Sequence, residues 1–154
     1  RGVKKIVIMS TDEVYGSTEQ IVDVNLLNPA NPYSASKAAA DMIVTAYKTM
    51  HPEISITTLR SNNIAGPGQF INNIIPRFSV LGLLKRKFTL HGDGSAMRRY
   101  LWVKDAAEAI WLLAEKATQS RIYHIGHEDK FSNLEIAEKI GNYLGLEDYI
   151  SYFS

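Results

Sequence analysis

Two short segments of this chain carry side chains that are suited to moving protons. Tyr33 and Lys37 are four residues apart, which places them on one face of a helix. Asp12 and Glu13 follow an apolar run that ends at Met9. A phenol, an ammonium group and two carboxyls together are the equipment for oxidising an alcohol and then eliminating water from a neighbouring carbon.

Tyr33 is the candidate base for the oxidation. A free tyrosine has a pKa near 10 and is a poor base at neutral pH. The ammonium of Lys37 is expected to stabilise the phenolate and so to lower the pKa of Tyr33, and a cationic nicotinamide would add to this effect. The alternative is an ordinary amphipathic helix, because a Y-x-x-x-K spacing alone is a weak signal. The small residues between the two and the carboxyl pair upstream favour the first interpretation.

Asp12 and Glu13 are the candidates for the elimination. Neighbouring residues of a strand point to opposite faces, so both reach one pocket only if the chain turns as it leaves the sheet. One neutral carboxyl beside one anionic carboxyl is what β-elimination of water requires. The alternative is a solvated pair in a loop. Ser10 and Thr11 place hydroxyl donors at the same strand end, which favours the catalytic interpretation.

The elements that must position these residues follow from apolar periodicity and from cap and turn residues. Asn31 and Ser132 are expected to cap helices, and Trp102 and Trp111 are expected in the core. Strands are predicted over 3–9, 54–60, 88–91, 100–103 and 122–125, and helices over about 32–51, 73–84, 105–116 and 133–144. This order predicts an α/β fold: part of a Rossmann-like doubly wound parallel sheet plus a smaller mixed α/β part.

Composition narrows the function further. The 154 residues are 45% hydrophobic, enough for a core, and the 17 basic and 16 acidic residues nearly cancel, so no bulk field favours nucleic acid or a membrane. The chain has no cysteine, which fits a cytoplasmic enzyme. No apolar run reaches the roughly 18 residues of a membrane span. The histidines lack metal-ligand spacing, so no metal site is expected.

A glycine-rich turn of the G-x-G-x-x-G type, which cradles a dinucleotide pyrophosphate, does not follow any predicted strand. The chain also begins without Met. We therefore expect an internal piece of a longer polypeptide, called the full-length protein below, and we expect that the 154 residues alone do not hold NAD tightly.

Four motifs carry a family likeness over nearly the whole chain. They are Ser10–Gly16 (S-T-D-E-V-Y-G), Asn31–Lys37 (N-P-Y-S-A-S-K), Ala65–Pro67, and Gly92–Gly94 followed by Arg98. Together they resemble the nucleotide-sugar 4,6-dehydratases, extended short-chain dehydrogenase/reductases that act on dTDP-glucose or UDP-glucose. The resemblance implies a cytoplasmic enzyme with bound NAD, and a homodimer formed through the helix that starts after Asn31. It assigns residues 1–66 to the carboxyl half of an NAD-binding domain and 67–154 mainly to an incomplete substrate domain.

The resemblance also implies roles for single residues. Tyr33, assisted by Thr11 and Lys37, takes the proton of the sugar C4 hydroxyl while hydride passes to NAD⁺. Glu13 removes the C5 proton that the C4 ketone makes acidic, Asp12 protonates the departing C6 hydroxyl, and NADH returns hydride to C6. The cofactor contacts implied are Ser10, Tyr33 and Lys37, and the substrate contacts implied are Asn63, Asn73, His91 and Arg98.

The chain departs from the family pattern at a few places. The family usually has Tyr where Ala65 stands, Pro-Glu-Lys where Ile71–Asn73 stands, and Asn where His124 stands. These departures surround the nucleotide end and leave the residues at the reacting carbons alone. Two alternatives stay open: an epimerase or decarboxylase on the same scaffold, and a truncated relative without catalysis. The identity of the base, thymine or uracil, is open as well.

Overall fold

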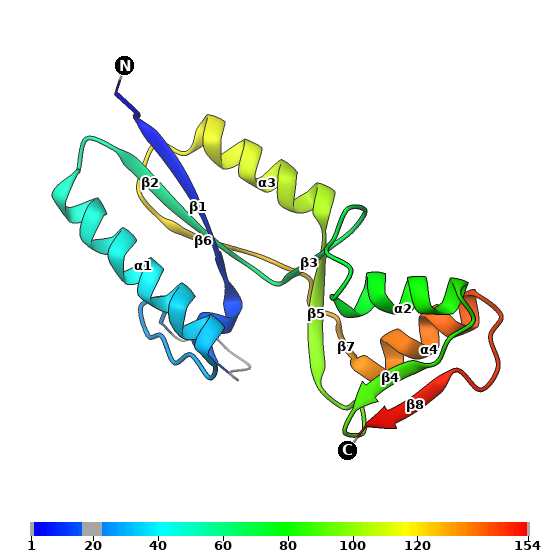
Figure 1. Ribbon diagram of the computed structural model, residues 1–154. Coiled ribbons are helices and arrows are strands. Elements are labelled where there is room, and N and C mark those ends of the chain that lie inside the picture. Colours follow the sequence, from blue (N-terminus) through cyan, green and yellow to red (C-terminus); the bar gives the residue numbers. More distant parts are fainter. Residues whose placement is uncertain (1, 17–22, 154) are drawn as a thin grey trace. The chain divides into compact units, whose positions relative to one another are not determined.

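The protein is described by a computed structural model that covers residues 2–16 and 23–153 (Figure 1). The chain divides into two compact units, here called the first and second unit. The first comprises Arg1–Ile64 and Leu101–Gly126, and the second Ala65–Tyr100 and His127–Ser154. The assignment of 67–154 mainly to a substrate domain stays a prediction. Within this range, residues 101–126 lie in the first unit, to which they contribute a helix and a strand.

The first unit is built on a parallel sheet with the strand order β1 (Lys5–Thr11), β2 (Ser55–Ser61) and β6 (Ile122–Ile125). Helices α1 (Pro32–Met50) and α3 (Val103–Lys116) lie on opposite sides of this sheet (Figure 1). β2 is buried from Ile56 to Ser61, as expected for a central strand with a helix on each face. The predicted doubly wound arrangement is therefore confirmed.

Local sequence explains where α1 begins and ends. The Asn31 side chain accepts the backbone N–H of Ser34, and the Ser34 hydroxyl accepts the backbone N–H of Asn31, so two end groups of the helix are satisfied. Pro32 follows at the first helical position, where its missing N–H costs nothing. The helix ends before His51 and Pro52. This cap fixes the start of the segment that carries Tyr33.

Side chains on the two faces of the sheet bond to different helices. Thr58 and Arg60 point toward α1, where they bond to Lys48 (3.2 Å) and Asp41 (2.8 Å) respectively. Lys5 of β1 instead donates to the carbonyl of Glu115 in α3 (2.5 Å). Alternation along the strands thus sends a polar set to the α1 face.

The second unit holds short elements around an apolar core. Helices α2 (Ile74–Leu83) and α4 (Asn133–Tyr143) accompany strand β4 (Phe88–His91), which pairs in parallel with β8 (Ile150–Phe153). β5 (Met97–Trp102) pairs antiparallel with β7 (Lys130–Ser132). The core residues are Phe78, Phe88, Leu90 and Ala137. The mixed pairing confirms the predicted mixed α/β character.

The sequence analysis missed three short strands. These are β3 (Asn63–Ala65), β7 and β8, and β5 starts three residues earlier than predicted. The placement of Trp102 and Trp111 in the core was wrong, because their exposed fractions are 46% and 66%. Among the described residues, every helix is too short or too polar to cross a membrane.

Candidate active site

The two carboxyls lie in a single turn, η1 (Asp12–Tyr15), which follows β1 directly. Thr11 caps this turn: its Oγ1 accepts the N–H of Glu13 (3.2 Å) and donates to Asp12 Oδ1 (3.4 Å). Gly16 ends it with φ of 70°, and a Cβ there would lie 2.3 Å from the carbonyl oxygen of Asn28, so only glycine fits. The chain therefore turns as it leaves the sheet, as joint action of the carboxyls requires.

Each carboxyl of this turn accepts a hydrogen bond from an asparagine amide. Asn62, which follows β2, donates from Nδ2 to Asp12 Oδ2 (2.6 Å). Asn31 donates from Nδ2 to Glu13 Oε2 (3.4 Å). The sequence analysis named Asn31 only as a helix cap and did not single out Asn62. The approach of both asparagines depends on tertiary structure, which their local sequence does not report.

Tyr33 lies within electrostatic range of the turn, but its pKa differs from the expectation. Partial burial raises the pKa of Tyr33 above its ordinary value, and the negative charges of Glu13 and Asp12 raise it further. The expected lowering by Lys37 was wrong. The Lys37 ammonium donates instead to the backbone carbonyl of Met9 (2.9 Å). Tyr33 as a residue is 57% exposed, so it remains open to a bound molecule.

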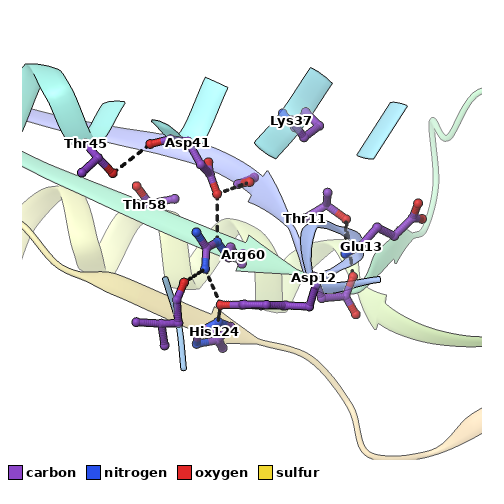
Figure 2. Close-up of polar contacts among 12 residues, drawn as sticks. Thr11, Asp12, Glu13, Lys37, Asp41, Thr45, Thr58, Arg60 and His124 are labelled. Carbon is purple, nitrogen blue, oxygen red and sulfur yellow. Dashed lines mark hydrogen bonds and ion pairs between the residues drawn. The ribbon is translucent and has the colours of Figure 1, made fainter. Parts of the chain in front are cut away.

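A network of side chains lies beneath the turn, between the sheet and α1. Asp41 Oδ2 accepts hydrogen bonds from the Ser10 hydroxyl (3.0 Å) and from Arg60 Nε (2.8 Å). Arg60 Nη1 donates to the hydroxyl of Tyr15, which in turn bonds to Nε2 of His124 (2.7 Å). Figure 2 shows Arg60 between Asp41 on one side and His124 on the other. Asp41 and Arg60 are only 4% and 3% exposed.

The sequence analysis did not identify this network, although the sequence contains a signal for it. Asp41 continues the four-residue spacing of Tyr33 and Lys37 along one face of α1. Arg60 is the only charged residue of a strand that is otherwise uncharged. An unpaired buried charge is very costly. A charged residue in a buried strand therefore predicts an oppositely charged partner on the element packed against it. His124 was noted only as a departure from the family pattern.

The four residues assigned to substrate binding divide between the units. Asn63 lies in β3, within the first unit, and is partly buried. Asn73, His91 and Arg98 are exposed side chains of the second unit, at the start of α2, the end of β4 and within β5. Arg98 Nη1 donates to the carbonyl of Met97 (2.8 Å). The residues assigned to catalysis thus lie together in the first unit. Asn73, His91 and Arg98 lie in the second unit.

The donor set of the first unit fits a dinucleotide at the carboxyl edge of the parallel strands, where open α/β sheets bind their ligands. An exposed phenol, Tyr33, and a half-buried ammonium, Lys37, stand beside this edge. The Ser10 hydroxyl is buried and donates to Asp41, and its contact with the cofactor stays a prediction. In the part of the chain that the structure describes, no group of three or more His, Asp or Glu side chains could hold a metal ion.

A parallel sheet covered on both faces, with a Tyr-Lys helix and a carboxyl turn at its carboxyl edge, defines an enzyme scaffold of the short-chain dehydrogenase/reductase type. Residues 1–126 match the NAD dependent epimerase/dehydratase family. The chain belongs to this family, which confirms the resemblance drawn from the sequence.

Individual relatives agree with this assignment. The chain is 40% identical over 154 residues to the dTDP-D-glucose 4,6-dehydratase of Dictyostelium discoideum, covering 91% of the chain and 35% of that protein. A crystal structure of dTDP-glucose 4,6-dehydratase from Bacillus anthracis with NAD matches with a TM-score of 0.88 and 36% identity, over 97% of this chain and 49% of that one. The structure of MoeE5 with UDP-glucose and NAD matches with a TM-score of 0.87 and 28% identity, over 99% and 52%. The chain thus spans about a third to half of the length of these relatives.

Proposed function

We propose that the full-length protein dehydrates a nucleoside-diphosphate glucose, dTDP- or UDP-glucose, to the 4-keto-6-deoxy sugar, with bound NAD. One observation carries this proposal: Asp12 and Glu13 share one turn, and their charges act on the phenol of Tyr33. An oxidation at C4 and an elimination across C5 and C6 need these groups around one sugar ring. The named activities of the relatives support the choice of reaction and of substrate class.

The residues of this chain divide the proton transfers between them. Tyr33 accepts the proton of the C4 hydroxyl, with Thr11 and Lys37 beside it. The resulting C4 ketone acidifies the C5 proton, which Glu13 removes as a base. Asp12 gives a proton to the C6 hydroxyl, which leaves as water. The C5=C6 double bond that remains takes up hydride at C6 and a solvent-derived proton at C5. The hydrogen bonds from Asn31 and Asn62 orient the two carboxyls for these separate tasks.

NAD, when bound, supplies the hydride acceptor for C4 and the hydride donor for C6. Tyr33 and Lys37 are the residues of this chain that would hold its nicotinamide end. The raised pKa of Tyr33 means that this phenol is a weaker base than free tyrosine in the protein alone. A positive charge brought close to the phenol would reverse this shift, so ligand binding and activation of Tyr33 are linked.

The direct test is to incubate the full-length protein with dTDP-glucose and with UDP-glucose in separate reactions in deuterated water. A 4-keto-6-deoxy product with deuterium at C5 is expected from at least one of them. A C4 epimer without deuterium at C5 would instead establish the epimerase alternative, and no conversion of either sugar would reject the proposal.

A variant sharpens this test. Glu13→Gln removes the base and should abolish deuterium incorporation at C5 while oxidation at C4 persists. Glu108→Gln, an exposed carboxyl in α3 of the same unit, is the matched control and should retain full activity. Continued exchange at C5 in Glu13→Gln would remove Glu13 from its proposed role.

The proposal extends to assembly of the full-length protein as a homodimer. The solvent side of α1 presents four large apolar side chains, Met42, Ile43, Tyr47 and Met50, with exposed fractions of 67%, 60%, 53% and 71%. Such an apolar stripe gains free energy when a second copy covers it. Light scattering should report a dimer that Ile43→Glu converts to a monomer. A monomeric wild-type protein would contradict this part of the proposal.

A further inference from the structure

A row of three side chains crosses the parallel sheet on the face toward α1. Ser10 of β1 stands opposite Arg60 of β2, and Arg60 stands opposite His124 of β6. Residues in register on adjacent strands present their side chains on the same face, so the three are lateral neighbours. Asp41 of α1 bonds to the first two, which ties this row to the helix that carries Tyr33.

Tyr15 joins the carboxyl turn η1 to the same row. Its hydroxyl bonds to Arg60 Nη1 and to Nε2 of His124, and its ring centroid lies 4.9 Å from the guanidinium carbon of Arg60. The residue is 6% exposed, so the ring is packed as well as hydrogen-bonded. Because Ser10 precedes η1 and Tyr15 is its last residue, the turn is anchored at both of its ends.

His124 also lies within electrostatic range of Asp12. Partial burial and the positive charge of Arg60 lower the pKa of His124, while the negative charge of Asp12 acts in the opposite direction. The groups that act on the imidazole are therefore Arg60, Asp12 and the Tyr15 hydroxyl. The row thus ends within electrostatic range of the carboxyl assigned to protonate the leaving group.

Stability alone does not account for this arrangement. Taking a guanidinium and a carboxylate out of water is costly, and well-packed apolar residues of similar volume commonly serve stability as well or better. Arg60 nevertheless donates hydrogen bonds to three separate segments: Asp41 in α1, Tyr15 in η1 and the carbonyl of Val24 (2.6 Å). A planar group with several fixed donors suits the task of holding segments in one geometry.

We infer that Arg60 and Tyr15 are positioning residues that hold the Asp12–Glu13 turn against α1 and thereby set the geometry of the elimination step. The inference rests on the proposed function. Neither side chain takes part in proton transfer to the sugar. They act through η1. Of the residues that serve the oxidation at C4, Tyr33 and Lys37 lie on α1 and Thr11 is the last residue of β1, so all three keep their positions without Tyr15.

The test separates the two chemical steps in the full-length protein. Tyr15→Phe keeps the packed ring and removes the hydroxyl that bonds to Arg60 and His124. Deuterium incorporation at C5 should fall by about ten- to a hundredfold, the size of effect that a small misplacement of catalytic groups produces. Single-turnover oxidation at C4, followed by NADH absorbance, should stay unchanged. The Arg60→Lys variant retains the charge opposite Asp41 but loses the fork that reaches Tyr15, and should show the same selective loss.

The matched control is Thr57→Val. Thr57 is a buried residue of β2, and its hydroxyl has no hydrogen-bond partner among the described residues. Its replacement should leave both steps unchanged. In the full-length protein, amide hydrogen exchange at residues 12–16 should accelerate in Tyr15→Phe and not in Thr57→Val.

The outcomes are distinct. A selective loss of exchange at C5 with faster amide exchange in η1 supports the inference. An equal loss of both steps, or the same loss in Thr57→Val, overturns the positioning role while the proposed function stands. A wild-type protein that makes no keto-sugar overturns the proposed function, and the positioning role with it.

Discussion

The two units of this protein differ in how polar their interiors are. The α1 face of the first unit encloses hydroxyls and one ion pair, Asp41 with Arg60. The second unit encloses aromatic and aliphatic groups, including the rings of Phe78 and Phe88 stacked with centroids 4.8 Å apart. A polar interior is specific in geometry and costly in free energy, whereas an apolar interior is stabilising and tolerant in detail. The polar interior, with its specific geometry, lies beneath the turn that carries Asp12 and Glu13.

The largest expected effect comes from breaking the buried pair. Arg60→Met leaves the carboxylate of Asp41 buried without its charge partner, which should cost about 3–5 kcal/mol of unfolding free energy. Native-state hydrogen exchange resolves the two units, so the loss should appear at amides of β2 and leave those of β4 unchanged. Uniform loss in both units would show that the polar interior does not belong to the first unit alone.

An exposed pair gives the matched control for this prediction. Lys87 and Asp148 of the second unit lie 3.0 Å apart with side chains 55% and 85% exposed. Lys87→Met should therefore change the unfolding free energy by no more than about 1 kcal/mol. Adding Asp41→Leu to Arg60→Met should recover much of the lost stability, because no buried charge is then left unpaired. If the double variant does not recover stability, the ion pair itself stabilises the fold, beyond avoiding the cost of an unpaired buried charge.

A substitution in the apolar core of the second unit should destabilise that unit. Leu90 is 2% exposed in the core of the second unit, and Leu90→Ala should cost about 3 kcal/mol through lost burial and the cavity that remains. The loss should appear in amide exchange of β4 and β8, and Leu90→Met should cost less than half as much because the volume is nearly conserved. An equal cost for both variants would contradict a packing origin.

The fold was predictable from the sequence where apolar runs and caps agree. The strands at 88–91 and 122–125 have the predicted bounds, and the caps Asn31 and Ser132 stand where expected. The three-residue strands β3 and β7 were not predictable, because three residues show no periodicity and pair only through tertiary contacts. Trp102 and Trp111 were misplaced because hydrophobicity does not say which face of a helix or strand meets a partner.

The candidate site was predictable only to the level of residue types. The Tyr-Lys spacing and the adjacent carboxyls could be read directly, since both are local in sequence. The shift of the Tyr33 pKa had the wrong sign, because Lys37 bonds to a backbone carbonyl and the carboxylates act on the phenol instead. The partnership of Arg60 with Asp41 joins residues 19 positions apart across two elements, and only the register of sheet and helix brings them together.

The helix caps allow a finer comparison between the units. Asn31 caps α1 and Ser132 caps α4, each through a capping box. Replacing either by Ala should cost about 1 kcal/mol of unfolding free energy. Only Asn31→Ala should also lower keto-sugar formation, because the Asn31 amide donates to Glu13 as well. Calorimetry measures the first effect and turnover the second, and equal turnover in both variants would leave Asn31 with a structural role alone.

The smallest expected effect concerns the charge that the carboxyl turn places near Tyr33. Burial and the charges of Glu13 and Asp12 raise the pKa of Tyr33, so its phenol should titrate above about 10, the value of free tyrosine. Removing one of these charges with Glu13→Gln should lower the pKa of Tyr33, and the effect of burial and of Asp12 should keep it above the ordinary value.

The chain has eight tyrosines, so the ultraviolet titration of each protein is compared with that of its Tyr33→Phe partner. Glu108→Gln should leave the pKa unchanged, and an unchanged pKa in Glu13→Gln would place Glu13 too far from the phenol to share a sugar with it. Since the folded protein disfavours the phenolate of Tyr33, this group should also reduce stability as the pH rises above about 10. Tyr33→Phe should remove this contribution but leave that of Tyr100, whose pKa is likewise raised by burial.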